Sequence, residues 1–309
     1  MRPSPATALG RLVTRARLLG FTPEAFADGH TIQLEFIRCL VRWIVLMCSR
    51  RAGKTVGIAG RYGTRSMATP GGNRIYLALT AGQAREIMWE PIWLPMCEKW
   101  RLPVRHNEVR MVTKFANGSK VRFGGTDDIQ AIKKELGAGL DEAAVDECQD
   151  QPDRVLRPLM TRILPHALTD RRGTLIASGV VPEVDAGYYM ELWKESDWEK
   201  FNWSQMDNPH MKDPMGELME YLARNPGLTM ESPVIQRERF GKFKYDREET
   251  AYRYDPALNG YHEEAPDWLA DVYAGRYPEE VTQRPGELSW KFIRPEAVAS
   301  AASIALRWV

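Results

Sequence analysis

Four short, continuous apolar runs in the first 180 residues indicate strands that are buried on both faces. Such runs are typical of a parallel sheet covered by helices, because neither face of a strand then meets water. They lie at Trp43–Cys48, Arg74–Leu79, Leu140–Val145 and Thr174–Ala177. Helical spacing fills much of the chain between them, notably residues 56–68 and Ala81–Trp100. Strands that alternate with such helices predict an α/β fold with a mostly parallel sheet and right-handed connections.

A different pattern, in which apolar and polar positions alternate, covers Val109–Phe123. Asn117-Gly118 interrupts it, and this dipeptide favours the tight turn of a β-hairpin. Beyond Asp197 the pattern changes again, because aromatic, proline and charged residues are mixed and continuous apolar runs become hard to find. We therefore expect a small second subdomain at residues 200–250. Residues 251–309 are expected to form a proline-rich tail.

Candidate chemistry first appears at Cys48–Thr55, between the first predicted strand and the first predicted helix. The segment ends in the Gly-Lys-Thr triplet of a phosphate-binding P-loop, in which backbone N–H groups and a helix N-terminus cradle an anion. Gly53 then lets the main chain approach the phosphates, Lys54 reaches the β- and γ-phosphates, and Thr55 ligates Mg²⁺. Cys48 replaces the usual first glycine, so a helix N-terminus without a ligand stays an alternative.

Two acidic pairs flank the apolar triplet at residues 143–145. Asp146-Glu147 follows the triplet, so Asp146 is expected beside the P-loop strand, where it would bind Mg²⁺. Glu147 is the candidate general base that polarises the attacking water. Asp141-Glu142 precedes the triplet and is expected at the opposite end of the strand. The P-loop and Asp146-Glu147 together predict ATP hydrolysis with Mg²⁺, and the alternative is a surface acidic pair.

Composition and charge refine this interpretation. The 309 residues are 44% hydrophobic and 27% charged, which fits a globular protein of about two domains. No run approaches the ~18 apolar residues of a membrane helix, and four scattered cysteines fit a reducing compartment. The net charge is only +1, but residues 1–125 carry 20 Lys/Arg and 7 Asp/Glu, whereas residues 126–309 carry 22 and 34. This asymmetry indicates a basic half that faces a polyanion.

The first 23 residues contain four arginines and no acid: Arg2, Arg11, Arg15 and Arg17. We interpret residues 1–29 as a basic N-terminal arm, in preference to an organelle transit peptide. The predicted organisation then continues with a P-loop ATPase core at 30–199, a linking or lid subdomain at 200–250 and the tail at 251–309.

These motifs resemble the ATPase portion of the large terminase subunit of tailed bacteriophages, the genome-packaging motor. The resemblance covers roughly residues 30–250, and its strongest part is Ser49–Thr55, because this family often lacks the first glycine and places arginine after serine. It implies a P-loop NTPase fold of the RecA/ASCE type. It also implies three further roles: Arg50 acts in cis on the γ-phosphate, Gln33 reads the adenine, and Ser178 senses the γ-phosphate. The implied nucleotide-binding residues are Gln33, Ser49, Arg50, Arg51, Ala52, Gly53, Lys54, Thr55 and Ser178.

The chain departs from the family pattern at several positions. Ser178–Pro182 resembles the coupling motif, but Val181 replaces its usual threonine. Many relatives carry an arginine before the acidic strand that acts on a neighbouring subunit's nucleotide, whereas this chain has Lys133 and Lys134 there. A lysine cannot reproduce the bidentate geometry of a guanidinium. The alternative trans-acting donors are Arg157, Arg162, Arg171 and Arg172.

Full-length relatives end in a nuclease domain whose clustered carboxylates bind two metal ions. After residue 250 we find no acidic set at strand ends, and the acids there lie in the proline-rich tail: Asp255, Glu263, Glu264, Asp267 and Asp271. We therefore expect the chain to stop before such a domain, and we do not predict nuclease activity for it.

The resemblance implies an ATP-hydrolysing motor subunit that drives double-stranded viral DNA into a procapsid. Its implied partners are double-stranded DNA, a portal protein, a small terminase subunit and further copies of the chain in a ring. It would be soluble, in the cytoplasm of the host. Two alternatives stay open: an ATP-dependent helicase or translocase on the same core, and a nucleotide-gated assembly module without useful turnover.

Overall fold

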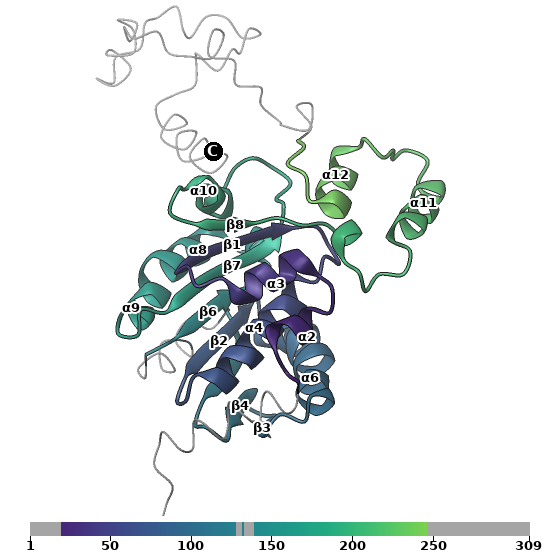
Figure 1. Cartoon of the computed structure of the whole chain (residues 1–309). Coiled ribbons are helices and arrows are strands. Elements are labelled where there is room, and N and C mark those ends of the chain that lie inside the picture. Colours follow the sequence, from purple (N-terminus) through teal and green to yellow (C-terminus); the bar gives the residue numbers. More distant parts are fainter. Residues whose placement is uncertain (1–19, 128–131, 133–138, 246–309) are drawn as a thin grey trace, which may run out of the picture. The chain divides into compact units, whose positions relative to one another are not determined.

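The computed structural model describes residues 20–127, 132 and 139–245 (Figure 1). These residues belong to one compact unit that ends at Tyr245. The proline-rich tail with its acids, most of the basic arm, and the pair Lys133 and Lys134 lie outside the described residues. Within the described part, no helix is both long and apolar enough to cross a membrane.

An eight-stranded sheet forms the centre of the unit, in the order β3-β4-β5-β2-β6-β7-β1-β8. Six neighbouring strands, from β5 to β8 in this order, are parallel, and β4 and β3 extend the sheet with antiparallel pairing. The predicted mostly parallel α/β sheet is thus confirmed. The strands are β1 (Trp43–Cys48), β2 (Asn73–Ala78), β3 (Val104–Asn107), β4 (Val112–Phe115), β5 (Lys120–Gly125), β6 (Glu142–Val145), β7 (Thr174–Val180) and β8 (Glu199–Phe201).

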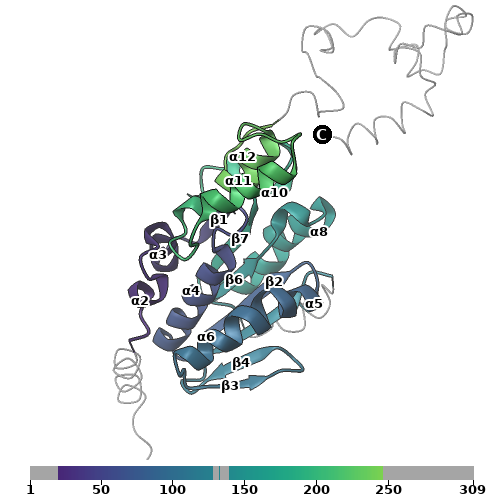
Figure 2. The same ribbon diagram turned by 90° about the vertical axis from the view of Figure 1, so that its right-hand side faces the viewer.

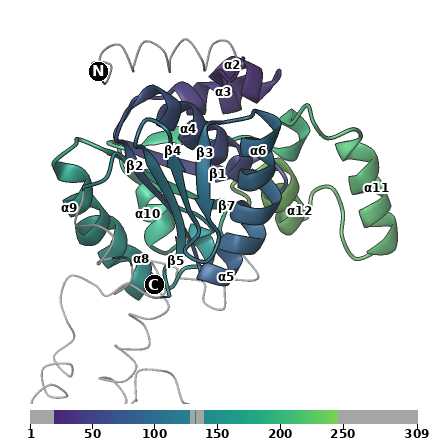
Figure 3. The same cartoon turned by 90° about the horizontal axis from the view of Figure 1, so that it is seen from below.

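Helices cover both faces of the sheet, as Figures 1 and 3 show. One face packs against α2 (Pro23–Ala27), α3 (Thr31–Arg38), α4 (Lys54–Ala68), α5 (Ala81–Ala84) and α6 (Leu94–Lys99). The other face packs against α8 (Asp153–Pro158), α9 (Leu164–Thr169) and α10 (Tyr188–Lys194). Two further helices, α11 (Pro214–Arg224) and α12 (Pro233–Phe240), follow the last strand.

The strand pattern explains the two cores. Along β1, Ile44 and Leu46 enter the core beneath α2–α6, whereas Val45 and Met47 enter the core beneath α8–α10. Every residue of β1 after Trp43 is buried, because successive side chains point to opposite faces and both faces are covered. This double burial is what a continuous apolar run predicts.

Several predicted elements have the expected bounds. β1 matches its predicted range, and the alternating segment forms the β4–β5 hairpin with Gly118 at φ +86° in the turn. The predicted helix at 81–100 is divided, because a π-helical segment at Arg85–Trp93 separates α5 from α6. Pro91 lies inside that segment and has no N–H to donate to the preceding turn, so regular α-helical bonding is interrupted there.

Four strands differ from the prediction. β7 continues to Val180, three residues beyond the predicted end at Ala177, so Ser178 lies within the strand. β6 begins at Glu142, two residues later than the predicted start at Leu140. β3 precedes the predicted hairpin and pairs with β4. β8 lies in the region without apolar runs, where it pairs with β1 at the edge of the sheet. Edge strands of three or four residues carry too few side chains for a recognisable pattern.

Candidate active site

The loop that joins β1 to α4 follows the carboxyl end of β1, and Figure 2 shows α4 beginning beside that end of the sheet. Two of its residues have left-handed backbone conformations, Arg51 at φ +56° and Gly53 at φ +87°. Gly53 is the N-cap of α4, and no side chain caps this helix. The first N–H groups of α4 therefore have no side-chain acceptor, which is the arrangement that receives an anion at a helix N-terminus.

Lys54, the first residue of α4, folds back over this loop. Its side chain is buried, and Nζ donates to the carbonyl oxygen of Ser49 at 3.0 Å. The Lys54 side chain thus lies against the backbone of the loop. A lysine beside the backbone N–H groups of such a loop favours a bound phosphate chain.

Cys48 occupies the position of the missing first glycine and is the last residue of β1. Burial raises the pKa of its thiol to about 12, and the thiol points to the carbonyl oxygen of Phe201 at 3.8 Å. The group therefore stays neutral and acts as a small apolar side chain. The replacement keeps the strand end buried.

Thr55 and Asp146 meet as the sequence predicts for a metal site. Thr55 Oγ1 donates to Asp146 Oδ2 at 3.0 Å, although the two residues are 91 positions apart. The Tyr76 hydroxyl donates to the same oxygen at 2.7 Å. Asp146 is fully buried, and in the described residues no cation forms an ion pair with it. A buried carboxylate that contacts only hydroxyl and backbone donors has the chemistry of a partial Mg²⁺ site.

Glu147 follows directly and is half-buried, with a left-handed backbone at φ +52°. Burial raises the pKa of its carboxyl group, and the neighbouring charge of Asp146 raises it further. A hydrogen bond from Gln149 and the charge of Lys54 lower it again. A half-buried carboxylate with a raised pKa is suited to accept a proton from water.

Gln33 lies on α3 and is buried against the loop. Its Nε2 donates to the carbonyl oxygen of Gly53 at 3.0 Å. The side chain packs closely on α4, because a Cβ at Gly57 would lie 3.1 Å from its Cγ. The sequence prediction thus places this amide next to the loop, while its role toward an adenine stays a prediction.

The two arginines of the loop, Arg50 and Arg51, form ion pairs with acidic residues of α12 and α11. Arg50 Nε donates to Glu238 Oε1 at 3.1 Å, and Arg51 Nη1 donates to Glu217 Oε2 at 2.8 Å. Both guanidinium groups are well exposed, at 59% and 64% of the side chain. These weak surface pairs leave either side chain able to turn toward a ligand.

Ser178 lies on β7, directly opposite Leu46 of β1. It is fully buried, and its hydroxyl has no hydrogen-bond partner among the described residues. A buried hydroxyl without a partner is unfavourable by itself, so this group supports the presence of a polar ligand near the strand ends. The observation agrees with the predicted phosphate-sensing position without testing it.

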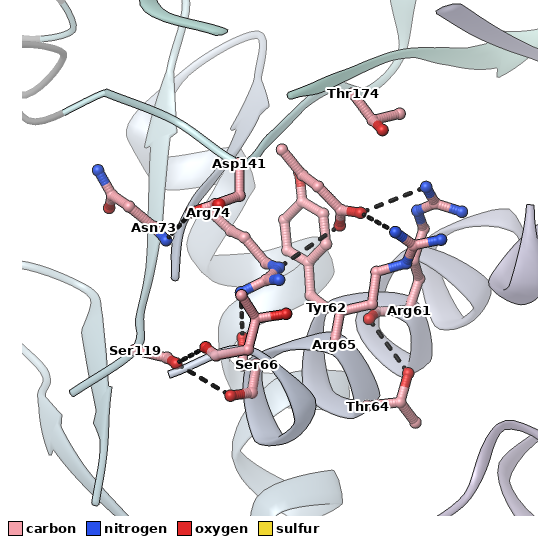
Figure 4. A network of polar contacts seen from close by, with 12 residues as sticks. Arg61, Tyr62, Thr64, Arg65, Ser66, Asn73, Arg74, Ser119, Asp141 and Thr174 are labelled. Atoms are coloured by element: carbon pink, nitrogen blue, oxygen red, sulfur yellow. Dashed lines mark hydrogen bonds and ion pairs between the residues drawn. The ribbon is translucent and has the colours of Figure 1, made fainter. Parts of the chain in front are cut away.

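The other acidic pair lies at the opposite end of β6, as predicted. Glu142 forms ion pairs with three arginines, Arg61, Arg65 and Arg74, at N···O distances of 3.0–3.5 Å. Figure 4 shows these arginines converging from α4 and β2. Asp141 pairs with Arg171 at 2.9 Å and accepts a hydrogen bond from the backbone N–H of Asn73. Both carboxylates are thus neutralised within the protein.

The candidate trans-acting arginines lie on the side of α8 and α9. Arg157 donates to Glu191 at 2.7 Å and stacks on Tyr188, and Arg171 pairs with Asp141. Arg162 and Arg172 are exposed. The structure of a single chain places none of them against a second copy, so the trans role stays a prediction.

Sequence reasoning missed two groups that contact the site. Tyr76 lies in β2 among apolar residues, and no local pattern distinguishes it from a core aromatic. Gln149 hydrogen-bonds to Glu147, and its position two residues after the acid pair was an available signal. Within the described part, no three His, Cys, Asp or Glu side chains gather into a metal cluster.

The sequence matches no family model and no curated protein. The structure is similar to the ATPase domain of the large terminase of Thermus phage P74-26, with a TM-score of 0.54 and 16% identity over 69% of this chain and 93% of that chain. The large terminase of bacteriophage HK97 gives a TM-score of 0.51 and 15% identity over 70% and 50%. A large terminase from another thermophilic bacteriophage, in complex with ATP-γ-S, gives 0.53 and 15% over 72% and 58%.

The last two matches show that this chain spans about half the length of the longer large terminases. The order of sheet and helices and the position of the phosphate loop agree with the predicted P-loop architecture. The described part of the chain therefore has the fold of the ATPase domains of phage large terminases.

Proposed function

We propose that this chain is the ATP-hydrolysing motor subunit that drives double-stranded viral DNA into a procapsid. The observation that carries the proposal is the meeting of Lys54, Thr55, Asp146 and Glu147 at the carboxyl ends of parallel strands. Ligands of open α/β sheets bind outside these strand ends. This position supports roles for these residues in phosphate binding, metal binding and water activation.

Each residue has a role that follows from its position. Lys54 and the loop backbone bind the phosphate chain, and Glu147 accepts the proton of the water that attacks the γ-phosphorus. Thr55 and Asp146 would hold Mg²⁺, which neutralises charge on the phosphate oxygens when it is bound. Ser178, Arg50 and Arg51 are proposed to contact the phosphates. Gln33, Ser49, Ala52 and Gly53 complete the proposed nucleotide contacts.

Nucleotide binding has support from a protein of the same fold. A large terminase from a thermophilic bacteriophage has been solved with ADP and with ATP-γ-S, at 16% and 15% identity to this chain. We extend that binding to the present loop because Lys54 and the buried hydroxyl of Ser178 are already in place.

The basic half of the chain supports DNA as the polyanion. Arg105 of β3 lies opposite Lys114 of β4, which in turn lies opposite Lys120 of β5. Arg105 and Lys114 are exposed, and none of the three forms an ion pair with another described residue. Like charges directly opposite in a sheet destabilise it unless a counter-charge binds. Duplex phosphates supply that charge without any base contact, so binding would tolerate any sequence.

The proposed assembly is a homo-oligomeric ring that works with a portal protein and a small terminase subunit in the host cytoplasm. A helicase on the same core is the second candidate, and it predicts strand separation of a tailed duplex. A nucleotide-gated assembly module is the third, and it predicts nucleotide binding without turnover. A steep rise of turnover with protein concentration would favour the ring.

The test is ATP turnover by the purified chain with and without Mg²⁺. Lys54→Ala should abolish turnover and weaken nucleotide binding, while Lys212→Ala, an exposed lysine elsewhere, should leave both unchanged. Wild-type turnover that survives Lys54→Ala, or that needs no Mg²⁺, would contradict the proposed site. DNA binding is tested separately: Arg105→Glu with Lys114→Glu should weaken it and flatten its salt dependence.

A further inference from the structure

Gln149 joins the candidate base to the end of a neighbouring strand. Its Nε2 donates to Glu147 Oε2 at 2.5 Å and to Asp150 Oδ2 at 2.8 Å. Its Oε1 accepts from the backbone N–H of Val180 at 2.9 Å. The amide orientation is fixed by this pattern, since carboxylates accept and a backbone N–H donates. The amide nitrogen thus donates to two carboxylates, and the amide oxygen accepts from one backbone N–H.

Gly179 provides independent evidence that the fold requires the Gln149 amide to lie against β7. Its φ is not in the left-handed region, so backbone conformation does not call for glycine. A Cβ at this position would instead overlap Gln149 Oε1, and Tyr189 would lie 3.1 Å away. The missing side chain at 179 therefore makes room for the amide of residue 149, which is 30 positions away.

The Glu147 carboxylate depends on this contact. Among the described residues, Gln149 is the only side chain that hydrogen-bonds to it. The backbone of Glu147 is left-handed, a conformation that costs free energy in a residue with a Cβ and that its surroundings must maintain. The bond to Oε2 orients the carboxylate and leaves Oε1 for a water molecule.

We propose that Gln149 is a positioning residue, which holds the Glu147 carboxylate in place and links it to the end of β7 at Val180. This inference rests on the proposed ATP hydrolysis. Ser178, with its unpaired hydroxyl, lies two residues before Val180 on the same strand. A ligand at Ser178 that displaces this strand end therefore moves Gln149, whose Oε1 accepts from the Val180 N–H. Through Gln149 it also moves the Glu147 carboxylate. Hydrolysis is thereby coupled to the position of β7.

The experiment compares turnover with nucleotide affinity in five variants. Gln149→Met keeps the volume of the side chain and removes the amide, so kcat should fall about 10–100-fold, as for other groups that orient a reacting residue. The KM for ATP and the binding of a fluorescent ATP analogue should change less than about threefold, since Gln149 does not contact the loop. Gln151→Ala is the matched control, because this glutamine of the same segment bonds Thr126 instead. It should keep kcat within about twofold of wild type.

A double-mutant cycle of Gly179 with Gln149 is the decisive test. Gly179→Ala should lower kcat as much as Gln149→Ala, because the new Cβ displaces the amide. The double variant should be no slower than Gln149→Ala alone, because the overlap with Gln149 is then removed and Tyr189 has to shift by only a few tenths of an ångström. Additive losses, a kcat of Gln149→Met equal to wild type, or a rise in KM that matches the fall in kcat would overturn the inference while leaving ATP hydrolysis intact. No turnover by the wild-type chain would overturn both.

Discussion

The two ends of β6 carry the same kind of dipeptide, Asp141-Glu142 and Asp146-Glu147, in opposite environments. At the amino end the carboxylates meet four arginines. At the carboxyl end Asp146 meets two hydroxyl groups and Glu147 meets one amide. The difference teaches that acidity alone does not define a site in this chain. What matters is whether the protein itself supplies the counter-charge.

The amino end is a closed network. Arg61 not only pairs with Glu142 but also donates to the carbonyl oxygens of Phe36 and Cys39, at the C-terminus of α3. The helix that begins at the phosphate loop is thereby joined to the helix that carries Gln33. At the carboxyl end no described cation forms an ion pair with Asp146 or Glu147, and Lys54 acts on Glu147 only through its charge.

The largest expected effect concerns the base. Glu147→Gln should lower kcat by about 10²–10⁴-fold, because an amide cannot accept the proton of the attacking water. Its unfolding free energy should stay close to that of wild type. Steady-state turnover and urea denaturation measure the two quantities. A Glu147→Gln protein that hydrolyses ATP normally would remove the functional half of the comparison.

The second-largest effect is expected at the amino end of β6. Glu142→Gln should lower the free energy of unfolding by about 3–5 kcal/mol, because Arg61 and Arg74 then stay buried without their carboxylate. Urea denaturation is the measurement, with Glu183→Gln as an exposed control. A loss below about 1 kcal/mol would mean that the cluster is hydrated and that the two ends differ less than they appear.

Asp146→Asn should separate stability from ligand binding. Without ligand, its unfolding free energy should change by less than about 1 kcal/mol, since no buried cation loses a partner. Wild-type protein should gain about 2.7 kcal/mol at a Mg-ATP concentration of 100 times Kd, and the variant should lose most of that gain. Thermal melts with and without Mg-ATP measure this. Equal protection of both proteins would place the metal elsewhere.

The smallest effect is expected at Asp141, the partly exposed carboxylate at the amino end of β6. Asp141→Asn keeps an oxygen acceptor for the N–H of Asn73 and loses only the ion pair with Arg171. Water screens this pair, so the loss should be about 0.5 kcal/mol. A loss as large as that of Glu142→Gln would show that the two carboxylates act as one unit.

Much of this comparison was readable from the sequence. The triplet at 143–145 between two acidic pairs predicted which pair follows the strand, because strand direction fixes the end at which each lies. The cradle at 48–55 and the hairpin at Asn117-Gly118 were equally local. The hydroxyl of Tyr76, the amide of Gln149 and strand β8 were not predicted. Their partners are set by tertiary packing, which has no period in the sequence.

The contacts of the phosphate loop extend furthest along the chain. The backbone N–H groups of Ser49 and Arg50 donate to the carbonyl oxygens of Trp203 and Glu238. The Trp203 Nε1 and Asn208 Nδ2 donate to the carbonyl oxygens of Ala52 and Arg51. β1 itself has both of its neighbours, β7 and β8, more than a hundred residues later.

This loop is therefore among the earliest parts of the chain to be synthesised and among the last to be completed. A ribosome adds about 5–20 residues per second, so the segment that ends with α12 follows the loop by roughly 10–40 s. For the first part of that interval, until β7 and then β8 are synthesised, β1 has neither partner strand. Chaperone binding to Trp43–Cys48 on the nascent chain is the expected consequence.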